Sequence, residues 1–226
     1  PLSLVRADWH FWDANWWPDW RLSARKLAWF YENSDGATVD GVISFTPTVM
    51  EKLLTIIGPV DMKDKYGLVF DADNFWLETQ KLAEQKPDIT KQPKKIIGDL
   101  MNEIMAELPK RLNKDNLLPL FKALNESLVS KNILFYFTDK DLEAKADDLG
   151  WSGRIKDTVG DYLNVINTNI AGGKSDRKIK QEIIHKTKIQ PDGSIIDDLT
   201  IKRVHGAIKR EPFSGVRNVD WVRVYV

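Results

Sequence analysis

The apolar pattern of this chain changes near residue 160, and the change restricts the folds available to it. Before that point, apolar residues recur with the helical period, as they do at Ile96, Ile97, Leu100, Ile104, Met105 and Leu108. After it, the long runs 178–190 and 194–205 meet at Pro191-Asp192-Gly193, a typical hairpin turn. The sequence therefore predicts an α/β (α+β) fold. A mixed-sheet α/β layer domain over residues 1–159 is followed by an antiparallel β segment over residues 160–226.

Helices and short strands alternate in the expected α/β domain. Helices are expected over residues 19–33, 48–57, 73–84, 93–112, 116–130 and 139–149. Strands are expected over residues 41–45 and 133–137, with a small hairpin at 60–62 and 67–70, and in the β segment also over 162–167 and 218–226. Asp19 or Ser23 can cap the first helix, and Thr46 followed by Pro47 marks the start of the second.

Six of the nine tryptophans stand within the first thirty residues: Trp9, Trp12, Trp16, Trp17, Trp20 and Trp29. Exposed indoles could stack on sugar rings or lie at a membrane interface, whereas buried ones would plug the core. Because buried tryptophan is the commoner case, we expect this cluster to be mostly buried. Polar residues are interleaved with the rings, and Asp13, Asn15, Trp16 and Trp17 are the candidate ligand-binding residues here.

Composition excludes several classes of site and partner. The formal net charge is zero, because 33 Lys and Arg balance 33 Asp and Glu, which disfavours a nucleic acid partner. No run approaches eighteen apolar residues, so we expect no membrane span in this chain. The absence of cysteine excludes disulfides, thiolate metal sites and cysteine nucleophiles. His10, His185 and His205 lack the spacing of a zinc site, so we expect no metal site and no evident cofactor.

Two further motifs favour structural roles. The segment around Gly172-Gly173-Lys174 could hold an anion through Lys174, but a strand connection that needs positive φ is the favoured interpretation. It does not match a phosphate-binding loop, because Thr168 stands where that loop requires glycine. Acidic pairs could be metal ligands, yet solvated faces and helix caps explain them better; these pairs are Asp139/Asp141, Asp147/Asp148 and Asp197/Asp198.

Several segments in order along the chain resemble one known family. They are Asp13-Ala-Asn-Trp-Trp-Pro-Asp-Trp20, residues 23–32, residues 40–49 leading into Gly58-Pro59, residues 160–176 and residues 217–226. With them the chain resembles the bacterial domain-of-unknown-function family 4012. That resemblance implies a membrane-anchored cell-surface protein, whose membrane helix would lie outside this fragment and whose remainder would be extracytoplasmic. The upstream block usual in that family is absent, so the α/β domain is expected to be partial.

A second stretch is similar to another family. Asp40-Gly-Val-Ile-Ser-Phe45 followed by Leu53-Leu54 and Gly58-Pro-Val60 resembles part of the LytR-CpsA-Psr family. This implies transfer of a glycopolymer from a polyprenyl-pyrophosphate carrier to the cell wall, with Mg²⁺ and arginines at the site. Arg21 and Arg25 are then the candidate catalytic residues. The chain departs from that family at Gly58-Pro59, where the family has two glycines, and the family's Arg-x-Asp segment would fall upstream of Pro1.

Two functions therefore stay open. The first is a binding or structural extracytoplasmic domain of a bacterial cell-envelope protein, with cell-wall glycan or a polyprenyl-linked glycopolymer as the partner. The second is a glycopolymer phosphotransferase of the LytR-CpsA-Psr type, or a degenerate relative of one. The absence of a convincing nucleophile or general base among the residues favours the first. Whether the chain is an enzyme is left undecided by the sequence.

Overall fold

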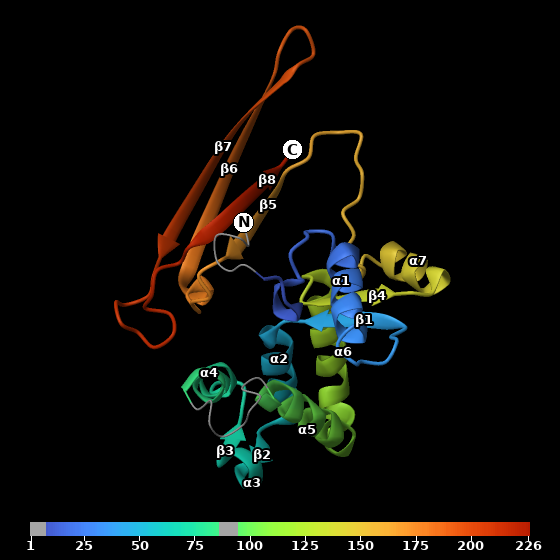
Figure 1. Ribbon diagram of the computed structural model, residues 1–226, viewed down its shortest axis with the longest axis vertical. Coiled ribbons are helices and arrows are strands. Elements are labelled where there is room, and N and C mark those ends of the chain that lie inside the picture. Colours follow the sequence, from blue (N-terminus) through green and yellow to red (C-terminus); the bar gives the residue numbers. More distant parts are fainter. Residues whose placement is uncertain (1–7, 86–94) are drawn as a thin grey trace. The chain divides into compact units, whose positions relative to one another are not determined.

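The computed structural model describes residues 8–85 and 95–226 (Figure 1). The chain divides into two compact units: one spans His10–Asp157, and the other contains Thr158–Val226 together with Asp8 and Trp9. Helices and antiparallel strands are both present, which confirms the expected α/β class. Among the described residues, no helix has the length and apolar character needed to cross a bilayer.

The unit His10–Asp157 holds all seven α-helices of the described residues. They are α1 (Trp20–Glu32), α2 (Pro47–Ile57), α3 (Lys63–Tyr66), α4 (Phe75–Gln85), α5 (Lys95–Arg111), α6 (Lys114–Val129) and α7 (Lys140–Asp148). Its strands are β1 (Gly41–Phe45), β2 (Val60–Met62), β3 (Leu68–Phe70) and β4 (Ile133–Phe137). These elements confirm the expected ones to within a few residues, except that the helical turn α3 joins the small hairpin. The first two residues of the helix expected over 93–112 lie outside the described residues.

Local signals set the ends of the first two helices. The Asp19 carboxylate accepts a hydrogen bond from the Arg21 N–H and caps α1, as the sequence predicts. Thr46 is the residue before α2, and Pro47 is its first helical residue. The Thr46 hydroxyl makes no cap bond and instead donates to Asn132 Oδ1 at 2.7 Å, which ties the start of α2 to the segment before β4.

The main core of this unit is helical. Side chains from α2, α4, α5 and α6 close over the β2–β3 hairpin, and the fully buried members include Met50, Leu54, Phe70, Leu100 and Ile104. The apolar side chains that α5 was expected to present at the helical period include Leu100 and Ile104, so the amphipathic pattern is used for packing. This core stabilises the lower part of the unit in Figure 1.

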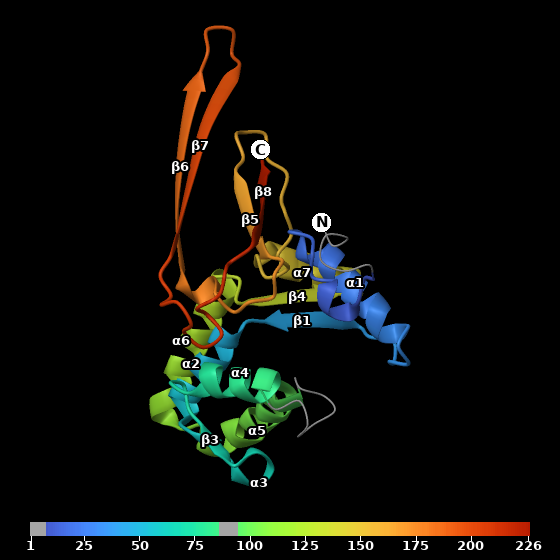
Figure 2. The same ribbon diagram turned by 60° about the vertical axis from the view of Figure 1, so that its left-hand side comes forward.

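A two-stranded ribbon forms the other part of the same unit. β1 and β4 pair antiparallel with Gly41 opposite Phe137 and Phe45 opposite Ile133. Helix α1 packs on this ribbon (Figure 2), and Trp20, Ala24 and Tyr136 make a small second core there. Every strand pairing in the described residues is antiparallel, so the sheet is not the mixed sheet that the sequence predicts. Short apolar strands do not reveal the direction of their partner.

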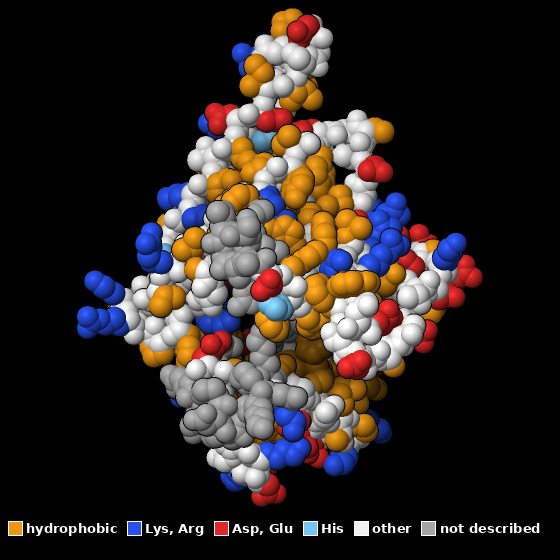
Figure 3. Space-filling model, viewed as in Figure 1, with side chains coloured by type: hydrophobic (Ala, Val, Ile, Leu, Met, Phe, Trp, Pro, Cys, Tyr) orange, Lys and Arg blue, Asp and Glu red, His pale blue; other side chains and the backbone are white. Residues whose placement is uncertain are grey.

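The unit Thr158–Val226 consists of two antiparallel ribbons. β6 (Ile179–Ile189) pairs with β7 (Ile195–His205) in a long hairpin, and β5 (Asn164–Asn169) pairs with β8 (Asp220–Tyr225). Arg203 of β7 links the ribbons by contacting Asn167 and Asp220. None of the described apolar side chains of this segment is buried. Figure 3 shows apolar side chains on its surface up to the tip of the hairpin.

The expected burial of the tryptophan cluster is wrong. Among the six indoles only that of Trp20 is buried, at 4% exposure, whereas Trp12 is 62% and Trp29 is 49% exposed. Trp16 and Trp17 are half-buried. The reason is the width of the structure beneath α1: a two-stranded ribbon offers that helix one narrow contact face, which buries a single indole, that of Trp20 at the start of the helix.

Candidate functional site

A cavity of about 500 Å³ lies between α1 and β1 in the unit His10–Asp157. Its volume is within the range of small-molecule sites. The lining is uncharged and mostly apolar, with four aromatic rings; it comprises Phe11, Asn15, Trp20, Leu27, Ala28, Tyr31, Val39, Gly41, Val42, Ile43, Ser44 and Phe45. Such a surface suits the apolar body of a ligand better than a phosphate or a sugar acid.

The outer edge of β1 contributes backbone groups to this cavity. Thr138 N–H donates to Asp40 O, and Thr46 N–H donates to Asn132 O. The backbone N–H and C=O groups of the even-numbered residues of β1 therefore point toward β4. The backbone groups of Gly41, Ile43 and Phe45 therefore point away from β4. In the part of the chain that the structure describes, no hydrogen bond reaches them. As far as residues 8–85 and 95–226 are concerned, β1 thus presents a free strand edge beside an apolar hollow.

The corresponding edge of β4 is covered. Phe135 N–H donates to Trp151 O at 3.0 Å, and Phe137 N–H donates to a Glu143 carboxylate oxygen at 2.9 Å. The two edges of the same ribbon therefore differ: one is closed by the protein itself, and the other borders the cavity. Strand edges left open in this way are sites where a further strand can add.

One residue of the cavity lining, Trp20, carries an unsatisfied donor. Its indole Nε1–H is buried and has no acceptor among the described residues. Buried donors in folded proteins are nearly always satisfied by protein, water or ligand. Trp20 also lines the cavity.

Arg21 and Arg25, the candidate catalytic residues, do not line this cavity. Arg21 forms an ion pair with Asp19 at 3.2 Å, and its hydrogen bond to that carboxylate raises the pKa of Arg21. Arg25 Nε donates to the Tyr136 hydroxyl at 3.3 Å, and its guanidinium lies over the Tyr136 ring. Both guanidinium groups thus serve contacts within the unit, on the side of α1 that faces β4 and α7.

The ligand-binding candidates of the tryptophan segment are separated by the structure. Asn15 lines the cavity. Asp13 belongs to a short 3₁₀ turn, Phe11–Asp13, and its carboxylate accepts from the His10 N–H at 3.2 Å. The Trp17 backbone is held by the buried Ser23 hydroxyl, which contacts both its N–H and its C=O at 3.1 Å. Trp16 and Trp17 are half-buried and do not line the cavity.

Lys174 lies in a connection that needs an unusual backbone. Gly172 has a φ of +73°, and the Lys174 N–H donates to Phe213 O at 3.1 Å. A Cβ on Gly173 would lie 2.7 Å from Val216, so the chain passes too close there for a side chain. The expected strand connection with positive φ is confirmed.

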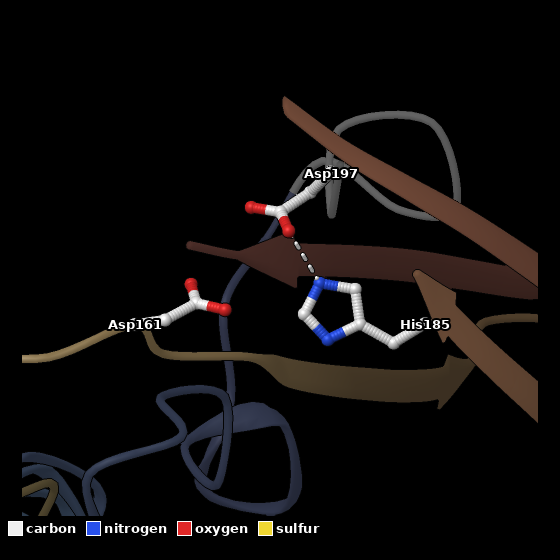
Figure 4. Close-up of side chains that lie close together, drawn as sticks. All are labelled: Asp161, His185 and Asp197. Atoms are coloured by element: carbon white, nitrogen blue, oxygen red, sulfur yellow. Dashed lines mark hydrogen bonds and ion pairs between the residues drawn. The ribbon is translucent and has the colours of Figure 1, made fainter. Parts of the chain in front are cut away.

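Sequence reasoning missed a cluster on the β6–β7 hairpin. His185 Nε2 lies 2.9 Å from Asp197 Oδ1, and Asp161, His185 and Asp197 each offer one ligand atom within 4.8 Å of the other two. Figure 4 shows the three side chains facing one another from three segments of the unit Thr158–Val226. The Thr187 hydroxyl also donates to Asp197 Oδ1, at 2.7 Å, and this bond lowers the pKa of Asp197.

Of the other acidic pairs, one is a helix cap as expected. Asp139 accepts from the N–H groups of Asp141 and Leu142 at the start of α7. Asp147 accepts from the Ser152 hydroxyl and forms an ion pair with Arg154 at 3.1 Å. Burial alone would raise the pKa of Asp147, but these two hydrogen bonds outweigh it and lower the pKa.

Comparison with known proteins gives one finding. The model of a family described as "Protein of unknown function (DUF4012)" matches residues 3–82. This segment contains α1, β1 and every residue that lines the cavity. No curated protein matches the chain, and no solved structure matches it.

Proposed function

We propose, from the match of residues 3–82 to the DUF4012 family model, that this chain is a non-catalytic binding domain. Its place would be the extracytoplasmic side of a bacterial cell-envelope protein, anchored by a membrane helix elsewhere in the parent protein. The observation that carries the proposal is the cavity between α1 and β1, because its uncharged aromatic lining borders an open strand edge. Binding there needs no nucleophile, acid or base.

The ligand class that best fits both features is an extended peptide segment. Its backbone would pair with the outward groups of Gly41, Ile43 and Phe45, and alternate apolar side chains would enter the cavity. Cell-wall glycan and polyprenyl-linked glycopolymer, which the family resemblance implies as partners, would use the aromatic rings but leave most of the strand edge unpaired. They remain the alternative ligands of the same cavity.

The transferase alternative receives less support from the site. A pyrophosphate leaving group needs cationic groups aimed at it, with Mg²⁺ as the further cation. Arg21 and Arg25 are engaged with Asp19 and Tyr136, and the cavity lining carries no charge. A polyprenyl-pyrophosphate bound there would have no cation at its headgroup from this lining.

The test is a titration with a model strand. Amide NMR spectra of the ¹⁵N-labelled chain would be recorded with an acetylated hexapeptide of alternating threonine and valine, a sequence of high strand propensity. We expect the largest shifts at Gly41, Ile43 and Phe45. Ile43→Pro removes one outward N–H and spares the bonds to β4, since proline is tolerated at a free strand edge. It should weaken binding by at least about fivefold, because one net hydrogen bond is worth about 1 kcal/mol.

A control variant and a second variant of the cavity complete the test. Ile43→Val retains the N–H and should bind as the unmodified chain does. Ala28→Leu fills the cavity from α1 without touching β1, and should also weaken binding. Shifts confined to other elements, or equal binding by all three variants, would rule out the cavity as a peptide site. A Mg²⁺-dependent response to a polyprenyl pyrophosphate would instead favour the transferase.

A further inference from the structure

We propose that Asp161, His185 and Asp197 bind a divalent transition-metal cation of the Zn²⁺ type. The three ligand atoms, an imidazole nitrogen and two carboxylate oxygens, lie within 4.8 Å of one another in the unit Thr158–Val226 (Figure 4). The proposal concerns a different unit from the cavity and does not depend on the proposed function.

The hairpin register brings two of the ligands together. Thr187 pairs directly with Asp197, and His185 pairs with Leu199, so the imidazole is the diagonal neighbour of the Asp197 carboxylate. Side chains alternate between faces along a strand, which places Lys186 and Asp198 on the opposite face. The third ligand, Asp161, comes from the segment just before β5. The two strands of the hairpin and the segment before β5 therefore supply one donor each to the same point.

The donor set and spacing suit a borderline-soft cation. Zinc binds imidazole nitrogen and carboxylate oxygen at about 2.0–2.2 Å, so two of its ligands in a tetrahedral site lie roughly 3.4 Å apart. The pair His185 Nε2 and Asp197 Oδ1, 2.9 Å apart, is already near that separation. Asp161 is exposed, and its ligand oxygen lies within 4.8 Å of the other two ligand atoms. An imidazole ligand favours zinc and its neighbours over Mg²⁺ and Ca²⁺.

Electrostatics and hydrogen bonding support the same assignment. Two carboxylates repel each other at this range, and a dication between them would remove that repulsion. The Thr187 hydroxyl donates to Asp197 Oδ1 at 2.7 Å and so fixes the orientation of that carboxylate. Hydrogen-bond partners of this kind orient the ligands of protein metal sites. Three protein ligands would leave one coordination position for water.

Calorimetric titration of the intact chain with ZnCl₂ tests the proposal, with Co²⁺ as an optical probe of coordination. We expect one site per chain, and no competition from excess Mg²⁺. His185→Ala, Asp161→Asn and Asp197→Asn should each weaken Zn²⁺ binding by at least about tenfold, since loss of a supporting partner alone costs a metal site about that much. Asp198→Asn is the matched control: it changes the same residue type next to Asp197 but on the other face, and should bind Zn²⁺ unchanged.

Each outcome of the titration either supports or overturns the proposed metal site. Loss of binding in the three ligand variants with retention in Asp198→Asn supports the site. Absence of Zn²⁺ binding by the unmodified chain overturns it, and so does equal binding by the ligand variants. Amide NMR spectra of each variant would show that the hairpin is still formed, so a loss of binding cannot be mistaken for unfolding. Competition by Mg²⁺ at equal concentration would overturn the assignment to a transition metal.

Discussion

Trp20 and Gly153 meet at the start of α1, where the Trp20 N–H donates to the Gly153 carbonyl at 3.2 Å. Gly153 has a φ of +62°, and a Cβ added there would lie 2.9 Å from Trp20 Cβ and 3.0 Å from Leu134 Cδ2. The contact joins the segment after α7 to the small core that holds α1 on the β1–β4 ribbon. A glycine is required because both the backbone angle and the space exclude a side chain.

Gly153→Ala should therefore lower the free energy of unfolding of this unit by roughly 1–3 kcal/mol, from backbone strain and overpacking together. Urea unfolding followed by circular dichroism measures the change. Gly98→Ala is the control, since Gly98 lies within α5 with no atom near the position of an added Cβ. It should raise the free energy of unfolding by about 0.5–1 kcal/mol. Equal effects from the two substitutions would contradict the close approach at Gly153.

The helical core predicts a large effect from a single truncation. Leu100 on α5 is fully buried, so Leu100→Ala should lower the free energy of unfolding by about 2–5 kcal/mol through lost burial and a residual cavity. Leu118 on α6 is 75% exposed, and Leu118→Ala should change it by no more than about 0.5 kcal/mol. Chemical denaturation of both variants measures these changes. A small loss in the free energy of unfolding for Leu100→Ala would mean that this core is loosely packed.

Tyr66 should ionise at a pH above the ordinary range of a tyrosine hydroxyl. Burial, with the hydrogen bond to Asp99 Oδ2 at 2.7 Å, raises the pKa of the Tyr66 hydroxyl to about 12. Because the folded-state pKa is raised, the stabilising contribution is complete below the unfolded-state value near 10, and it is lost as pH rises toward 12. Absorbance titration near 295 nm, compared with that of Tyr66→Phe, isolates this group. A transition near pH 10 that disappears in Tyr66→Phe would refute the assignment.

Iodide quenching should distinguish the tryptophans of the N-terminal segment. Trp12 is exposed and Trp20 is buried, so Trp12→Phe should reduce the quenchable part of the emission. Trp20→Phe should remove only emission that iodide does not reach. The measurement is a Stern–Volmer titration of each variant in the folded state. If Trp12→Phe left the quenchable part unchanged, the exposed placement of the 3₁₀ turn Phe11–Asp13 would be contradicted.

The candidate sites could be read from the sequence only in part. Counting outward from Pro191-Asp192-Gly193 places Thr187 opposite Asp197 and His185 diagonal to it, so the hairpin turn contained the signal for two of the three proposed metal ligands. The pair Asp197 and Asp198, adjacent along the chain, is also typical of a solvated surface, and this second interpretation hides the signal for a metal ligand. The approach of Asp161 had no local signal, because it depends on where β5 lies within its unit. The cavity between α1 and β1 also has no local signal in the sequence, although Asn15, one of the predicted ligand-binding residues, lines it.

The sequence by itself determined the elements and their ends. Helical periodicity in α5, the cap at Asp19, the Pro47 start of α2 and the hairpin turn all act between residues close along the chain, so their physics is local. Only the tertiary structure decided that the β1–β4 ribbon has one closed and one open edge, and that five of the six N-terminal indoles are not buried. Those outcomes depend on which surfaces pack against each other, and such contacts form between segments that lie far apart in the sequence.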